Sequence, residues 1–227
     1  MNINTITGSS LLGSGSTASQ STTATSSSSS PQLAKAEKRI QTDVDSTKAQ
    51  LSQFGLLKSA LSEAQVAAKA LSGLTASSSA STTTVALGSF FNRFNGSVTA
   101  ANAAATGSAG VNAKRVVQDL KSALRSDPAT QAALKTLGLS VRSDGTLVQD
   151  AKKFATALNA DPAGVRAALA VVGKKVDAVN SRELASNGTV GQALAGLNQH
   201  STVLTAQQKA MTGLQQAMAA YKANSAG

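Results

Sequence analysis

The chain of 227 residues lacks cysteine and tryptophan and contains one histidine. Without cysteine it cannot form disulfides, thiolate metal sites or a cysteine nucleophile. The histidine, His200, stands between Gln199 and Ser201 without an orienting acid, so we interpret it as a solvated surface residue. The sequence also lacks a nucleophile elbow, a phosphate-binding glycine loop and a cluster of metal ligands. These absences argue against an enzyme, and we expect no cofactor and no metal.

Aromatic residues make up 3% of the chain, although 41% of its residues are hydrophobic. Most of the apolar residues are alanine, leucine and valine. Small and aliphatic side chains favour closely packed helices over a broad sheet or a pocket for a flat cofactor.

Long apolar runs are absent as well, and no segment approaches the roughly 20 apolar residues that a transmembrane helix needs. Residues 1–31 lack the basic start, the apolar stretch and the cleavage site of a signal peptide. They are rich in serine and threonine, which predicts a disordered leader. A similar composition begins many substrates of bacterial type III and flagellar export machines, which gives this segment a second interpretation.

The charge is strongly basic, with a formal net charge of +10 from 21 Lys and Arg against 11 Asp and Glu. Such an excess suits nucleic acid or an anionic membrane surface if the cations are concentrated. Here they are dispersed in small groups such as Lys114 and Arg115, with little aromatic residue between them for stacking on bases. We therefore favour solvated helix faces over a nucleic-acid footprint.

Two long segments with a helical hydrophobic period lie near the ends of the chain, at residues 31–73 and 189–222. In both, apolar residues recur three, four or seven positions apart, which places them on one side of a helix. Such helices need a partner for their apolar faces, so we expect them to pair as a coiled-coil-like stem. The expected packing or assembly contacts are Leu51, Phe54, Leu57, Leu61, Leu197, Leu204, Met211 and Met218.

Residues 75–111 are rich in serine, threonine and alanine, which predicts a low-complexity linker. This segment holds three of the five phenylalanines, namely Phe90, Phe91 and Phe94. We interpret the three rings either as core that folds back onto the helices or as an exposed contact for a partner.

Further helices and one β-hairpin are predicted between residues 112 and 188. Pro128 follows Asp127, and Pro162 follows Asp161. Since proline cannot continue a helix and the preceding aspartate caps a new one, each pair separates two helices. Alternating apolar residues flank Asp144 and Gly145, a strong signal for a hairpin with a two-residue turn.

The predicted fold is therefore mainly α, with long N- and C-terminal helices packed as a stem, short helices and one small β-hairpin. The expected divisions are a leader at 1–31, the first stem helix at 32–74, a linker at 75–111, a small α and hairpin region at 112–188, and the second stem helix at 189–227.

The order and residues of these elements resemble one family, the flagellar filament cap proteins, also called hook-associated protein 2. Residues 39–71, RIQTDVDSTKAQLSQFGLLKSALSEAQVAAKAL, look like the N-terminal helix of that family. Residues 137–169, LGLSVRSDGTLVQDAKKFATALNADPAGVRAAL, follow its C-terminal pattern, and a long amphipathic helix then ends the chain. The chain departs from the family in lacking its large β-rich middle domains and its usual run near the N-terminus.

The resemblance implies a structural, non-enzymatic protein of the bacterial flagellum, secreted to the cell exterior and assembling through its terminal helices. The implied partners are further copies of the chain, flagellin-like or hook-associated proteins, and an export chaperone. The outer plate of the cap is built by the missing domains, so the resemblance covers the helical stem. Two alternatives stay open: a basic binding module for nucleic acid or anionic surfaces, and an exported effector that binds a host protein through the phenylalanine cluster.

Overall fold

A helix of 42 residues opens the part of the chain that the structure, a computed structural model, describes, which is residues 31–226. This helix, α1, spans Pro31–Ser72. Proline suits a first helical position because its missing N–H has no partner there in any helix. Phe54, Leu57 and Leu61 lie on its buried side at spacings of three and four residues. The expected leader at 1–31 lies, apart from Pro31, outside the described residues.

The segment expected to be a linker contains a second long helix instead. Helix α2 spans Ala80–Ala104, and the Ser79 hydroxyl caps it by accepting from Thr82 N at 3.0 Å. Its buried residues include Leu87, Phe90 and Phe94, again three and four positions apart. This corrects the expectation of a low-complexity linker at 75–111. The helical period was present, but many serines, threonines and alanines diluted it.

The next four helices are divided at the two aspartate-proline pairs. Helix α3 spans Gly110–Arg125 and α4 spans Pro128–Thr136, while α5 spans Ala151–Ala160 and α6 spans Pro162–Leu184. Asp127 caps α4 by accepting from Thr130 N at 3.2 Å, and Asp161 caps α6 by accepting from Gly164 N at 2.8 Å. The two aspartate-proline pairs therefore separate helices, as predicted.

The β-hairpin is confirmed, but its turn is longer than predicted. Strand β1, Leu139–Val141, pairs antiparallel with β2, Leu147–Gln149. Arg142 N donates to Thr146 O at 2.8 Å, which leaves three residues in the loop. Gly145 ends this loop with a φ of 94°, a backbone conformation that glycine adopts without strain. The structure thus has a three-residue turn instead of a two-residue one.

One side chain fastens the hairpin to the helices. Asn95 of α2 accepts from Leu147 N at 2.7 Å and donates to Leu147 O at 3.1 Å. This pair of bonds satisfies both backbone groups of Leu147 on the side away from β1. The edge of β2 is therefore blocked at Leu147, which matters because open strand edges attract further strands.

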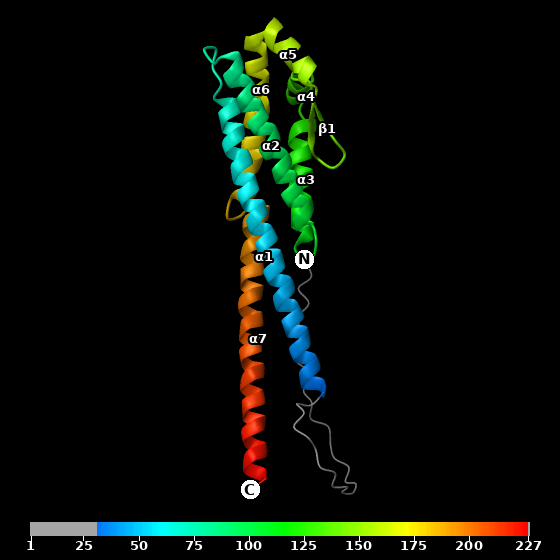
Figure 1. Ribbon diagram of the computed structural model, residues 1–227, viewed down its shortest axis with the longest axis vertical. Coiled ribbons are helices and arrows are strands. Elements are labelled where there is room, and N and C mark those ends of the chain that lie inside the picture. The colour runs from blue at the N-terminus through cyan, green and yellow to red at the C-terminus, as the bar shows by residue number, and fades with distance from the viewer. Residues whose placement is uncertain (1–30, 227) are drawn as a thin grey trace.

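Figure 1 shows an elongated molecule with a helical head at one end and a two-helix stem at the other. In the head, α2 and α6 pack against the second half of α1, and α3 packs against both α2 and α6. The last helix, α7, spans Thr189–Ser225 and runs back along α1, away from the head. The mainly α fold with paired terminal helices and one small hairpin is confirmed.

A polar cluster lies where α6 ends, just before the chain turns into α7. Arg182 donates to Oε1 of the buried Glu183 through Nε and Nη2, each at 3.1 Å, and its Nη2 lies 3.4 Å from Asp119 Oδ2 on α3. One guanidinium thus serves two carboxylates. Burial first, and then the nearby charge of Glu183, raises the pKa of the Asp119 carboxyl, and Arg182 and Arg115 offset this in part.

We expect the Asp119→Asn variant to be more stable than the parent at pH 7. Because folding raises the pKa of Asp119, this residue lowers stability as pH rises from its ordinary pKa of about 3.9 through the folded value. The amide of the variant is neutral at every pH, and the Asp119 carboxyl of the parent becomes neutral as pH falls. The stability advantage of the variant should therefore shrink as pH falls toward 4. Urea unfolding between pH 4 and pH 7 measures this difference.

Asp127→Asn is the matched control, and its expected effect on stability at pH 7 has the opposite sign. Hydrogen bonds from Thr130 lower the pKa of Asp127, so the ionised carboxyl contributes stability that is lost only below its ordinary pKa. This variant should lose some stability at pH 7. A less stable Asp119→Asn protein at pH 7 would show instead that the ion pair with Arg182 outweighs burial.

Candidate assembly surface

The residues predicted as packing contacts fall into two groups along the stem. Phe54, Leu57 and Leu61 are completely buried, and Leu197 and Leu204 are buried as well. Leu51 is half-buried and packs against the same core. All six therefore take part in packing within the chain. Met211 is half-buried and Met218 is 37% exposed, so these two differ from the rest.

The phenylalanine cluster is core and corrects one expectation. Phe90 and Phe94 have no exposed surface, and their ring centroids lie 5.8 Å apart, within the usual range for aromatic pairs. Phe91 is half-buried and packs against the same core. Since Phe90 and Phe94 are unavailable to a partner, the interpretation of this cluster as a partner contact is wrong for both.

The stem loses its core toward its free end. Residues 31–43 of α1 and 205–225 of α7 contain no buried residue, and Val44 and Leu204 are the last buried apolar side chains before them. We call these two stretches together the open stem end. Helices in water are held mainly by packing of an apolar face, which these stretches do not find within residues 31–226.

Apolar side chains nevertheless continue along the open stem end. Ile40 and Met211 are half-buried, whereas Leu214 is 48% exposed and Tyr221 is 76% exposed. On α7, Met211, Leu214, Met218 and Tyr221 stand three, four and three positions apart. This spacing continues the stripe that is buried closer to the head, so the same face of α7 passes from covered to uncovered.

Polar bonds link the two helices where the core ends. Gln208 Nε2 donates to Gln41 Oε1 at 2.9 Å, and Gln215 Nε2 donates to Glu37 Oε2 at 2.9 Å. A groove of about 270 Å³ lies beside them and is lined by Glu37, Ile40, Gln41, Gln208, Met211 and Thr212. Exposed bonds of this kind contribute little stability, so the two helices are held weakly here.

The charge of the open stem end is positive. Its cations are Lys35, Lys38, Arg39, Lys209 and Lys222, and its carboxylates are Glu37 and Asp43. The three cations on α1 line a shallow hollow together with Thr42 and Asp43. The surface therefore combines an apolar stripe on α7 with a cationic flank on α1.

Metal ligands do not gather at this surface or elsewhere in residues 31–226. In that part of the chain, no group of three or more histidine, cysteine, aspartate or glutamate residues is placed to hold a metal ion. None of the helices there combines the length and apolar character needed to cross a membrane. His200 is exposed on α7, as predicted.

A comparison with known protein families identifies the chain. The family model for the C-terminus of flagellar hook-associated protein 2 matches residues 71–225, which is more than half of the chain. The chain belongs to this family. The resemblance seen in the sequence is thereby confirmed. No curated protein and no solved structure matches the chain.

The hook-associated family match covers helices α2 to α7 and includes the uncovered stripe of α7. It begins at the last turn of α1, so the similarity of residues 39–71 to an N-terminal helix of the family stays a prediction. Leu214 and Tyr221 belong to the same helical apolar stripe in the sequence, but they are not among the expected contacts. Periodicity identifies the apolar face of a helix, and it does not show where along the helix that face loses its cover.

Proposed function

We propose that this protein is a structural, non-enzymatic component of the bacterial flagellum that assembles through its open stem end. In this proposal the protein is exported and acts outside the cell, joined to further copies of itself or to flagellin-like and hook-associated proteins. Membership of the hook-associated protein 2 family supports the flagellar role. An export chaperone would keep the stem stripe covered before assembly.

One observation carries the assembly part of the proposal. Met211, Leu214, Met218 and Tyr221 continue the face of α7 that is buried nearer the head, yet residues 205–225 contain no buried side chain. Covering an apolar face stabilises a helix complex by about 25 cal/mol for each Å² removed from water. A helix from a neighbouring subunit would provide that cover in the same way that α1 covers the upper part of α7.

The proposal concerns the stem and not the plate of a filament cap. Between α1 and α3 the chain has one helix, α2, which belongs to the helical head. Within residues 31–226, the head presents helices and a two-stranded hairpin and holds none of the large β-rich domains of the family. We therefore propose a role in axial joining through helices.

Static light scattering across a salt series tests the assembly. We expect a discrete oligomer whose mass is unchanged from low to high ionic strength, because apolar burial is not screened by salt. A monomer that also fails to bind flagellin-like or hook-associated proteins would contradict the proposal. Retention of nucleic acid that salt removes would favour the basic binding module.

Substitution of the stripe gives a sharper form of this test. We expect the Leu214→Ser, Met218→Ser double variant to weaken self-association by at least about tenfold, since each fully buried side chain contributes about 1.5–3 kcal/mol. Its melting temperature as a dilute monomer should stay close to that of the parent, because neither side chain is buried within the chain.

Val66→Ser is the matched control for the double variant. Val66 lies on the head-proximal part of α1 and is 69% exposed, so it offers an apolar side chain remote from the open stem end. This control should associate like the parent. Equal weakening in the control and in the double variant would place the interface elsewhere.

A further inference from the structure

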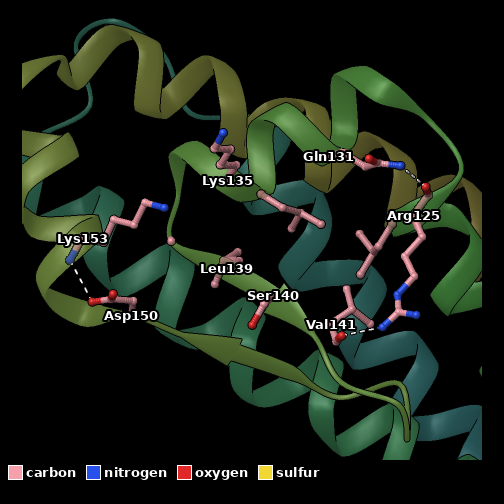
Figure 2. A pocket seen from close by; sticks show the side chains of 11 residues that line it. Arg125, Gln131, Lys135, Leu139, Ser140, Val141, Asp150 and Lys153 are labelled. Carbon is pink, nitrogen blue, oxygen red and sulfur yellow. Dashed lines mark hydrogen bonds between the residues drawn. The ribbon is translucent and has the colours of Figure 1, made fainter.

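A further hollow lies in the head, far along the sequence from the open stem end. It has a volume of about 650 Å³ and lies between α4 and strand β1. Figure 2 shows its lining, with Leu139, Ser140 and Val141 of β1 along one side. Lys135 of α4 and Lys153 of α5 lie toward one end of this strand, and Arg125 of α3 lies at the other. We call this hollow the β1 groove.

The register of the hairpin shows which backbone groups face the β1 groove. Asp150 N donates to Gly138 O, and Arg142 N donates to Thr146 O, each at 2.8 Å. Bonded and non-bonded pairs alternate along an antiparallel ladder, so Ser140 pairs with Val148 through hydrogen bonds. The N–H and C=O groups of Leu139 and Val141 therefore point away from β2, toward the outer edge of β1.

Most of these outer groups have no partner in the part of the chain that the structure describes. Arg125 Nη2 donates to Val141 O at 2.5 Å. Within residues 31–226, the N–H groups of Leu139 and Val141 donate no hydrogen bond outward, and Leu139 O accepts none. At the outer edge of β2, in contrast, Asn95 bonds both backbone groups of Leu147. The hairpin thus has one edge bonded by a side chain at Leu147 and one edge open beside a groove.

The charges around the groove select the kind of segment that would fit. Arg125, Lys135 and Lys153 contribute three cations to its lining, and Asp150 contributes the one carboxylate. The Asp150 carboxylate accepts from Lys153 N at 3.0 Å as the cap of α5, so it is already engaged. Leu124, Leu134 and Leu139 add an apolar floor. An occupant would therefore be extended, with acidic and apolar residues.

We propose that the β1 groove binds an extended acidic peptide segment of a partner protein, which adds a third strand to the hairpin. Adding a strand to an open edge is a common mode of peptide recognition, in which backbone bonds give affinity and flanking side chains give specificity. Residues 1–30 of this chain contain no Asp, Glu, Lys or Arg, so they lack the complementary charge. This inference does not depend on the open stem end or on the proposed function.

Fluorescence anisotropy with the full chain tests the proposal. The probe is a labelled eight-residue peptide of alternating glutamate and valine, compared with a peptide in which lysine replaces glutamate. We expect the glutamate peptide to bind at least about tenfold more tightly at low salt, with the difference shrinking as salt screens the three cations. Equal binding of the two peptides would overturn the proposal.

The strand geometry is tested on the unaltered protein by methylating alternate backbone nitrogens of the probe. Methylating one set of alternate nitrogens removes the donors that face β1, and methylating the other set leaves those donors intact. We expect the peptide without those donors to bind about tenfold or more weakly, and the peptide that keeps them to bind like the parent probe. The same affinity for both methylated peptides would exclude addition of a strand.

Two protein variants, with one control, complete the test. Val141→Pro removes an outward N–H while the neighbouring Ser140 keeps its bond to β2, so the variant should fold and bind the probe weakly. Lys135→Glu should weaken binding, whereas Lys152→Glu, an exposed residue outside the groove, should not. Two results would overturn the proposal by assigning the edge to this chain instead. One is displacement of the probe by a synthetic peptide of residues 1–30, and the other is a dimer of the protein that dissociates in the Val141→Pro variant.

Discussion

Replacing Phe94 by alanine is expected to destabilise the protein by about 3–5 kcal/mol, the usual cost of removing a buried aromatic ring. Phe94 has no exposed surface, and its ring pairs with that of Phe90 at the contact of α2 with the rest of the core. Native domains are stable by about 5–15 kcal/mol, so this one change removes a large share of the total. Urea unfolding followed by circular dichroism measures the loss.

Val85→Ala is the matched control in the same helix. Val85 lies on α2 but is 68% exposed, so removing its methyl groups should change stability by less than about 0.5 kcal/mol. A similarly small effect of Phe94→Ala would contradict the burial of this ring in the core.

Adding a single methyl group at Gly173 is expected to destabilise the protein by about 1–3 kcal/mol, because it overpacks a close helix contact. A Cβ atom at this position of α6 would lie 2.5 Å from Ala68 O and 2.9 Å from Ser72 N, both backbone atoms of α1. Backbone atoms of a packed helix cannot move aside as a flexible side chain can. The Gly173→Ala variant should therefore push α6 away from α1 and lower the melting temperature.

Gly96→Ala separates this packing effect from helix propensity. Gly96 lies inside α2, and a Cβ atom there would meet nothing within 4 Å. Alanine loses less backbone entropy than glycine in a helix, so this variant should gain about 0.5–1 kcal/mol. A gain of stability in Gly173→Ala as well would contradict the close approach of α6 to α1.

The sequence allowed good prediction of helices that begin at strong local signals. The aspartate-proline pairs at Asp127 and Asp161 each begin a helix, and Pro31 begins α1. These signals are local, because a fixed φ and a capping carboxylate act within one helical turn. The turn of the hairpin was less well predicted, since Asp144 and Gly145 suit both a two-residue and a three-residue loop.

Residues whose role depends on distant parts of the chain could not be assigned from the sequence. Gln50 of α1 has the character of a surface residue, yet it is buried and accepts from Ala109 N and Ser108 Oγ, each at 3.0 Å. The partners lie 58 and 59 positions along the chain, so no local pattern indicates them. The open edge of β1 is a similar case, since its exposure depends on where α4 and Arg125 pack.

The sequence by itself determined the class of the protein: a mainly helical chain of the hook-associated family with paired terminal helices and one hairpin. Those features follow from the period of apolar residues, from caps and prolines, and from residue order, all of which act over short distances or are read directly. Only the tertiary structure decided that α2 is core, that the stem is uncovered beyond Val44 and Leu204, and that one edge of the hairpin is open. Burial depends on which surfaces meet, and surfaces far apart in the sequence meet only when the whole chain is folded.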